Sequence, residues 1–131
     1  MPVLPELTAD NLSFWTGGRD GHLMIAHCDS CDRAIHPPQP LCPGCLGRSV
    51  SPRPALGGGV IVSNTVNWQE WSPDLPVPYI LAIVELDGEP GVRITSRVVG
   101  SDPASVAIGQ RVMVDFEHHG DVWIPVFRLL G

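Results

Sequence analysis

Toward the end of the chain, residues 111–127 alternate apolar and polar side chains with the two-residue period of β-strands. Along 111–117 one set of alternate positions is apolar and the other mostly polar: Val112, Val114 and Phe116 against Met113, Asp115 and Glu117. After an expected turn at His119-Gly120-Asp121, the alternate residues Val122, Ile124 and Val126 repeat the apolar face. The pattern predicts an antiparallel hairpin with one face turned to a core.

Glycine, proline and aspartate divide the region after residue 53 into strand patterns. We expect five strands, at 60–68, 79–86, 92–99, 111–117 and 122–127. Residues 101–106 read as a short capped helical turn between the third and fourth strands. Five strands with a helical connection at that place are typical of an OB-fold barrel. The sequence therefore predicts a mainly β fold with a five-stranded OB-fold domain at 54–131.

The first segment, residues 1–24, predicts a short helix that Thr8 caps and Gly17-Gly18 ends. Its apolar residues are too few for a core of their own: Leu7, Leu12, Phe14 and Trp15. They must therefore bury against something else. One interpretation packs them on the barrel of the same chain, and the other makes Leu12, Phe14 and Trp15 a partner-binding surface.

The middle segment, residues 25–53, contains all four cysteines of the chain. They form two Cys-x-x-Cys pairs separated by ten residues: Cys28 and Cys31, then Cys42 and Cys45. Two residues between thiols let both sulfurs face one ion, and four soft thiolates suit zinc, or iron in a rubredoxin-like site. The spacing predicts a tetrathiolate metal site in a zinc ribbon, closed by a polar, proline-containing linker at 48–54.

Other uses of these cysteines remain open. Two disulfides require an oxidising compartment, but the chain begins Met1-Pro2-Val3-Leu4-Pro5-Glu6 without a basic start or a long apolar run, so we expect a cytoplasmic location. A redox Cys-x-x-Cys would leave the second pair unexplained. His27 or His36 could also replace one thiolate as a ligand.

A metal held by four thiolates has no open position for water or substrate, so the site is expected to be structural and not catalytic. The ribbon segment is poor in apolar residues and needs such a link to fold. Metal ligation contributes on the order of 10 kcal/mol to modules of this kind.

Composition narrows the function further. The chain has 131 residues, 44% of them hydrophobic, a net charge of −6, and no lysine. This acidic balance argues against a nucleic-acid-binding protein, which needs a basic face for phosphates. No apolar run approaches the 18 residues or so of a membrane span, so no membrane partner is expected.

Candidate catalytic groups have simpler interpretations. Asp115 and Glu117 could act as an acid and a base, but they fit an outward, solvated strand face. His118 and His119 are expected in a turn. The serines lack a nucleophile-elbow sequence. Trp68 and Trp71 precede a proline-rich stretch in the loop between the first two strands, a loop through which OB-folds often bind ligands.

The order of these motifs resembles the DUF35 family, whose members join a rubredoxin-like zinc ribbon to an OB-fold. The resemblance covers nearly the whole chain. Its most specific marks are Phe14-Trp15, the four cysteines and Ile108-Gly109-x-x-Val112. Supporting marks are Gly21-His22-Leu23, Pro37-Pro38 and the glycines at 57–59. Gln39 stands where family members commonly have arginine.

The resemblance implies an accessory subunit of thiolase-like acyl-CoA enzymes. Such subunits accompany thiolases with hydroxymethylglutaryl-CoA synthase, acyltransferases that make acetylphloroglucinols, and retro-aldolases that shorten steroid side chains. The chain is then a non-catalytic subunit of a hetero-oligomer with a thiolase-like catalytic partner, with acyl-CoA at the shared interface. Aromatic rings stack on adenine and guanidinium groups bind phosphates, so Trp68, Trp71, Arg93 and Arg97 are the expected CoA-binding residues.

Two rival functions remain from the residues alone. An OB-fold can bind single-stranded nucleic acid, which the acidic charge disfavours. A zinc site can hydrolyse a substrate, which a closed ligand shell disfavours.

Overall fold

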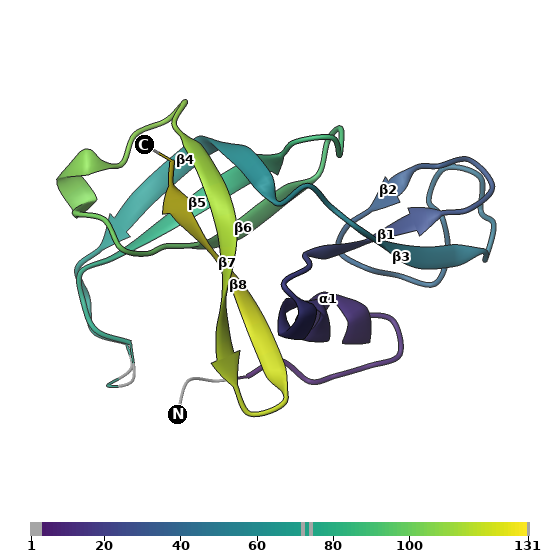
Figure 1. Cartoon of the computed structure of the whole chain (residues 1–131), viewed down its shortest axis with the longest axis horizontal. Helices are drawn as coiled ribbons and strands as arrows, with labels where there is room; N and C mark the ends of the chain where they lie inside the picture. The colour runs from purple at the N-terminus through teal and green to yellow at the C-terminus, as the bar shows by residue number, and fades with distance from the viewer. Residues whose placement is uncertain (1–3, 72, 74, 131) are drawn as a thin grey trace.

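A computed structural model describes residues 4–71, 73 and 75–130 of the chain (Figure 1). A short helix, α1 (Leu12–Thr16), precedes a three-stranded sheet and a closed barrel. The small sheet and the barrel form two lobes, and α1 lies between the small sheet and the hairpin that ends the chain. The predicted mainly β architecture, a zinc ribbon followed by a five-stranded barrel, is confirmed. Within the described residues, no helix is long and apolar enough to cross a membrane.

The barrel has the strand order β4-β5-β6-β8-β7 and closes by pairing β4 with β7. Its strands lie close to the predicted positions: β4 (Gly58–Asn67), β5 (Tyr79–Leu86), β6 (Arg93–Val98), β7 (Arg111–His119) and β8 (Val122–Leu129). The predicted helical turn is the 3₁₀ helix η2 (Pro103–Ser105), where Asp102 Oδ1 accepts the Ala104 N–H at 2.9 Å. This order and the helical connection are those of an OB-fold.

Strand alternation builds the barrel core. Along β5, every second residue is buried from Ile80 to Leu86. On β7, Val112 is fully buried while Val114 and Phe116 pack against the same core, as the sequence pattern predicts.

The expected core face of β8 is only partly confirmed. Val122 and Val126 are buried as expected, but Val126 lies opposite Asp115, and the β8 residue that faces Val114 in the barrel core is Phe127. The hairpin loop has two residues, Gly120 and Asp121, because His119 pairs with Val122. The sequence pattern predicts a three-residue turn, His119-Gly120-Asp121, and a one-residue change in loop length turns every following side chain to the other face.

His118 and His119 are therefore strand residues at the end of β7, not turn residues. The His118 ring stacks on Trp123 of β8, with ring centres 4.1 Å apart. Gly120, with φ of 58°, supplies the left-handed backbone that the tight loop needs. Both faces of β8 are covered, since Val126 is also buried, and the ion pair between Arg97 of β6 and Glu117 of β7 crosses this strand on the outside.

Thr8 does not cap α1 directly, because α1 begins at Leu12 and its N-cap residue is Asn11. The Thr8 hydroxyl accepts the N–H of Asn11, and the Asn11 side chain accepts the N–H of Thr8. This reciprocal pair resembles a capping box and brings the chain into α1 at Leu12. The α-helix ends before Gly17 as expected, but the chain continues as the 3₁₀ helix η1 (Gly17–Asp20).

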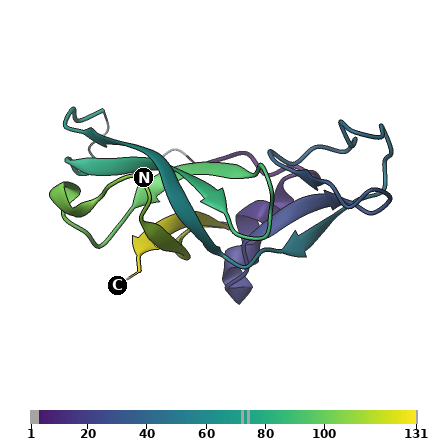
Figure 2. The same cartoon turned by 90° about the horizontal axis from the view of Figure 1, so that it is seen from above.

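The two glycines of η1 serve close packing. A Cβ atom at Gly18 would clash with Phe116 and Trp123, so glycine lets the backbone lie against the β7–β8 hairpin there. A Cβ atom at Gly17 would lie 2.5 Å from the His22 carbonyl oxygen and would also meet Met24, so this glycine lets η1 lie against the start of β1. Figure 2 shows from above how the helical segment lies between the barrel and the smaller sheet.

The smaller sheet has the order β2-β1-β3, from β1 (Met24–Cys28), β2 (Ala34–Ile35) and β3 (Val50–Pro54). The prediction of a linker at 48–54 is wrong for its second part, which is strand β3. Ala55 N–H bonds Leu23 O, so the paired register places the nitrogens of Pro52 and Pro54 on the open edge. Proline is tolerated there because no ladder hydrogen bond is lost.

A buried contact between a histidine and a glutamate side chain joins the two lobes. His27 of β1 and Glu89 of the β5–β6 turn are 6% and 8% exposed, and His27 Nε2 lies 2.7 Å from Glu89 Oε2. The other ring nitrogen, Nδ1, donates to the Ile25 carbonyl oxygen at 2.8 Å. Both ring nitrogens are thus satisfied, and a nearly buried polar contact holds the ribbon to the barrel.

We predict that Glu89→Ala lowers the free energy of unfolding by about 3 kcal/mol, because it leaves His27 buried without its partner. Urea unfolding of the metal-bound protein measures this loss. Glu85→Ala is the control, since Glu85 lies 4.0 Å from Arg93 on the surface and such pairs contribute less than about 1 kcal/mol. Equal losses in the two variants would contradict a special role for the buried pair.

Candidate functional site

The four cysteines come together on two similar turns of the ribbon. In the first turn the N–H of Asp32 bonds the Cys28 carbonyl oxygen at 2.8 Å, and in the second Leu46 bonds Cys42 in the same way at 2.9 Å. Asp32 and Leu46 both have left-handed backbone, with φ of 61° and 62°. Each Cys-x-x-Cys pair is therefore the same local structure, presented twice toward one point.

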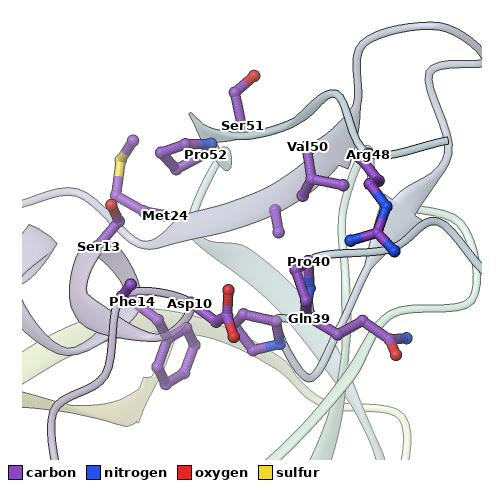
Figure 3. A pocket seen from close by; sticks show the side chains of 13 residues that line it. Asp10, Ser13, Phe14, Met24, Gln39, Pro40, Arg48, Val50, Ser51 and Pro52 are labelled. Atoms are coloured by element: carbon purple, nitrogen blue, oxygen red, sulfur yellow. The ribbon is translucent and has the colours of Figure 1, made fainter.

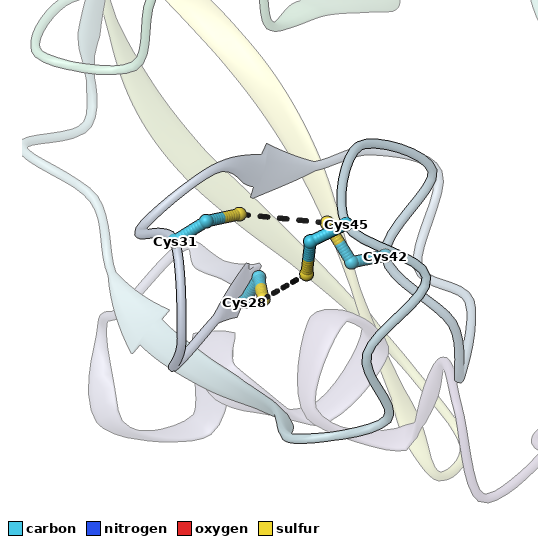
Figure 4. A group of neighbouring side chains, drawn as sticks. All are labelled: Cys28, Cys31, Cys42 and Cys45. Atoms are coloured by element: carbon cyan, nitrogen blue, oxygen red, sulfur yellow. Dashed lines mark hydrogen bonds between the residues drawn. The ribbon is translucent and has the colours of Figure 1, made fainter.

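The sulfur positions fit a single ion (Figure 4). All four Sγ atoms lie within 4.8 Å of one another, and the Cys28–Cys45 and Cys31–Cys42 pairs are 3.6 Å apart. A tetrahedral ion with metal–sulfur bonds of about 2.3 Å separates its sulfurs by about 3.8 Å. A disulfide needs about 2.05 Å, so the four groups are free thiols and not bridged pairs.

Backbone N–H groups donate to the thiols, and they lower the pKa of two of them, Cys28 and Cys42. The N–H groups of Gly44 and Gly47 point at Cys42 and Cys45, with nitrogen–sulfur distances of 3.4 Å. Hydrogen bonds, of which the one from the Cys45 N–H has the largest effect, lower the pKa of Cys42 to about 6. In the same way, hydrogen bonds lower the pKa of Cys28, with the largest effect from the Cys31 N–H. Although the Arg33 N–H acts to lower it, the hydrogen bonds to the Cys28 and Cys42 thiols raise the pKa of Cys31 to about 11.

Neither candidate histidine joins this cluster. His27 uses both ring nitrogens in the contacts to Ile25 and Glu89. His36 packs against the ring of Phe14, with centres 5.0 Å apart, and burial lowers its pKa. Among the described residues, the ligand set is four thiols, which leaves a bound ion no position for water or substrate.

The helix residues proposed for partner binding have different surroundings. Phe14 is 7% exposed and contacts Trp15 edge-to-face at 4.9 Å. Trp15 is partly buried against the barrel core, and Leu12 is 46% exposed. The helix thus packs within its own chain and still presents Leu12. A partner contact at Leu12, Phe14 and Trp15 stays a prediction.

The four residues expected at CoA do not gather in one place. Trp68 and Trp71 lie on the loop after β4, 71% and 75% exposed. Arg97 is paired with Glu117, and Arg93 lies at the other end of β6 beside Glu85. Four residues along a strand separate the two arginines by about 13 Å. CoA binding by this set stays a prediction.

The two acidic residues of β7, Asp115 and Glu117, pair with different arginines. Asp115 Oδ2 accepts from Arg128 Nε at 2.7 Å, and this bond lowers the pKa of Asp115. Glu117 pairs with Arg97 instead. Both carboxylates are held on the outer face, which supports the solvated interpretation over an acid and base pair.

A small hollow of about 180 Å³ lies between α1 and the ribbon (Figure 3). Arg48 points into it toward Pro40 and Gln39, while Phe14 forms part of the helix side. Gln39 thus shares the hollow with the guanidinium of Arg48. Gln39 is the position at which DUF35 members commonly have arginine.

Sequence reasoning missed the contact between His27 and Glu89. The two residues are 62 positions apart and neither belongs to a motif, so no local pattern signals their contact. The cysteine spacing, in contrast, is a local signal.

Comparison with known proteins agrees with this architecture. Residues 15–51 match the rubredoxin-like zinc ribbon domain of ChsH2, and residues 52–117 match its C-terminal OB-fold domain. Among solved structures, the chain is similar to a chain of the "Ltp2-ChsH2(DUF35) aldolase", with a TM-score of 0.85, 31% identity, and coverage of 96% of this chain and 98% of that one.

Curated relatives fall into two groups. The chain is 32% identical to a probable enoyl-CoA hydratase alpha subunit of Thermomonospora curvata and 33% identical to the 3-oxo-4,17-pregnadiene-20-carboxyl-CoA hydratase alpha subunit of Mycobacterium tuberculosis. These matches cover 95% and 86% of this chain, which spans only 39% and 35% of the two relatives. It is also 31% identical to a DUF35 domain-containing scaffold protein of Methanothermobacter thermautotrophicus, with 72% of this chain and 71% of that protein covered.

We predict one tightly held metal ion per chain and its loss in Cys42→Ser, which removes a buried ligand from a ribbon with little core. Elemental analysis of protein purified under reducing conditions measures the metal content. Ser30→Ala is the matched control, because it changes the same type of turn but keeps the backbone N–H that bonds Cys28. Full metal content in Cys42→Ser, or none in the unchanged protein, would contradict the assignment.

Proposed function

We propose a function from the premise that this chain belongs to the DUF35 family, as a zinc ribbon and OB-fold protein of the ChsH2 type. It is an accessory subunit that binds and stabilises a thiolase-fold enzyme acting on acyl-CoA, and it does not itself carry the chemistry. The observation that supports this most is the similarity of nearly the whole chain to one chain of an aldolase complex.

The metal site supports an accessory role. Zinc is the ion we assign to it, because four thiolates in tetrahedral positions suit zinc in a rubredoxin-like ribbon. With all four ligand positions taken by sulfur, the ion would link the two ribbon turns and would not activate water. The candidate acid and base groups on β7 are also held by arginines.

The partner's substrate is proposed to be an acyl-CoA thioester of lipid or steroid breakdown. The names of the hydratase relatives, one of them for a pregnadiene-carboxyl-CoA, and of the aldolase structure support this class.

The proposed location is the cytoplasm, because free thiols in a metal site fit a reducing compartment. Contact of Trp71, Arg93 or Arg97 with CoA is the finer part of the proposal.

We predict that the isolated chain turns over no acyl-CoA, whereas the assembled complex with its thiolase-fold subunit does. Copurification of the untagged chain identifies the subunit, and a thioester or carbon–carbon cleavage assay measures the activity of each preparation. Metal-dependent turnover by the isolated chain would revive the zinc hydrolase alternative. Salt-dependent oligonucleotide binding without a protein partner would revive the nucleic-acid alternative.

We also predict that Leu12→Asp weakens the complex by about tenfold or more, because the exposed leucine of α1 would lose an apolar contact. Titration calorimetry of the purified subunits measures the affinity, and the thermal midpoint of the isolated chain should stay unchanged. Trp15→Ala should weaken the complex too, with some loss of stability since Trp15 packs on the core. The control is Leu56→Asp between β3 and β4, where leucine is 75% exposed. Equal affinity of the Leu12 and Leu56 variants would remove the helix from the interface.

A further inference from the structure

Trp68 stands beside a hollow that the fold does not fill. The indole is 71% exposed, although tryptophan is highly buried on average in folded proteins. The hollow has a volume of about 400 Å³ and lies between the end of β4 and η2. Its lining residues come from three segments: Val66 and Trp68, Pro78, and Asp102, Pro103 and Ala104.

Hydrogen bonds fix the segment that carries Trp68. Asn67 pairs with Tyr79 across the β4–β5 ladder, and the Asn67 side chain donates to the Gln69 carbonyl oxygen at 2.7 Å. These contacts hold the chain on both sides of Trp68. On the opposite wall, Asp102 is fixed as the cap of η2 by the Ala104 N–H.

The Asp102 carboxylate has capacity for another partner. Its Oδ1 accepts the Ala104 N–H, and no arginine or histidine pairs with Asp102 among the residues that the structure describes. The Arg128 guanidinium lies beside Gly100, but its Nε bonds Asp115 at 2.7 Å. A carboxylate and an indole thus border the same hollow without a cation between them.

This combination suits a long side chain that ends in a cation. Val66 and the prolines offer apolar walls for a methylene stem, the indole face attracts a cation, and the carboxylate pairs with it. Arginine fits best, because its planar guanidinium can stack on the indole while it bonds a carboxylate. A CoA phosphate fits poorly, since it would meet Asp102.

We propose that the Trp68 hollow binds an arginine side chain that the catalytic partner subunit presents. The proposal rests on the accessory-subunit function and names a specific contact within it. A second copy of this chain is a poorer source of that arginine, because two chains of net charge −6 repel each other.

The hollow is tested first on the full chain alone. Titration with N-acetylarginine methylamide, followed by NMR of the tryptophan indole N–H signals, should shift Trp68 more than Trp71, which is 75% exposed but does not line the hollow. Asp102→Asn should abolish this difference, because asparagine keeps an oxygen for the Ala104 N–H and removes the charge. N-acetylleucine methylamide is the control ligand. Equal shifts of the two signals, or an unchanged difference in Asp102→Asn, would overturn the proposal.

The partner contact is tested on the complex. Trp68→Ala should weaken assembly with the thiolase-fold subunit by about tenfold or more, as for other interface tryptophans. Leu56→Ala should leave assembly unchanged, since Leu56 lies between β3 and β4, is 75% exposed and lines neither the hollow nor the metal site. Asp102→Asn should give a smaller loss and a weaker dependence on salt. Unchanged affinity of Trp68→Ala in a complex that forms would overturn this inference and leave the proposed function standing. If no complex forms, the proposed function fails, and the NMR titration still decides whether the hollow takes an arginine.

Discussion

The four-cysteine centre is the constraint on which the rest of the ribbon depends. Between β1 and β3 the chain makes two turns with left-handed residues at Asp32 and Leu46, and the ribbon's own core is Ala26, Cys28, Ile35 and Cys42 with Val50 against it. So small an apolar cluster cannot offset the conformational entropy of the loops around it. A metal bound by the two turns links segments that would otherwise separate, and it fixes β1, which carries His27 to the barrel.

Strand β1 connects the ribbon to the barrel and to α1. His27 meets Glu89 of the barrel, while Leu23 and Ile25 enter the barrel core together with Phe14 of α1. The helix, ribbon and barrel therefore share one packed unit, although the ribbon and barrel look like separate lobes in Figure 1. This arrangement suits an accessory subunit, because a rigid body can present widely spaced surfaces, such as Leu12 of α1 and Trp68 of the barrel, to one partner.

The parts of this structure that sequence predicts are those with local signals. Cys-x-x-Cys spacing determines a turn, and the alternation of β7 determines which of its residues pack on the core. The inward face of β8 was not predictable from alternation alone, because one residue in the Gly120-Asp121 loop reverses it. Strand β3 was not predicted because its sequence contains Pro52 and Pro54. Proline is excluded from central strands but is tolerated on an open edge. The wrong expectations thus fall where tertiary pairing decides.

The central claim is that the metal is a closed, structural link in a subunit that acts by assembly. X-ray absorption at the metal edge tests it most directly, on the isolated chain and on the complex with acyl-CoA bound. The account predicts zinc with four sulfur neighbours at about 2.3 Å in both samples, without change when substrate is present. An oxygen or nitrogen neighbour that replaces a sulfur, above all one that appears with substrate, would contradict it.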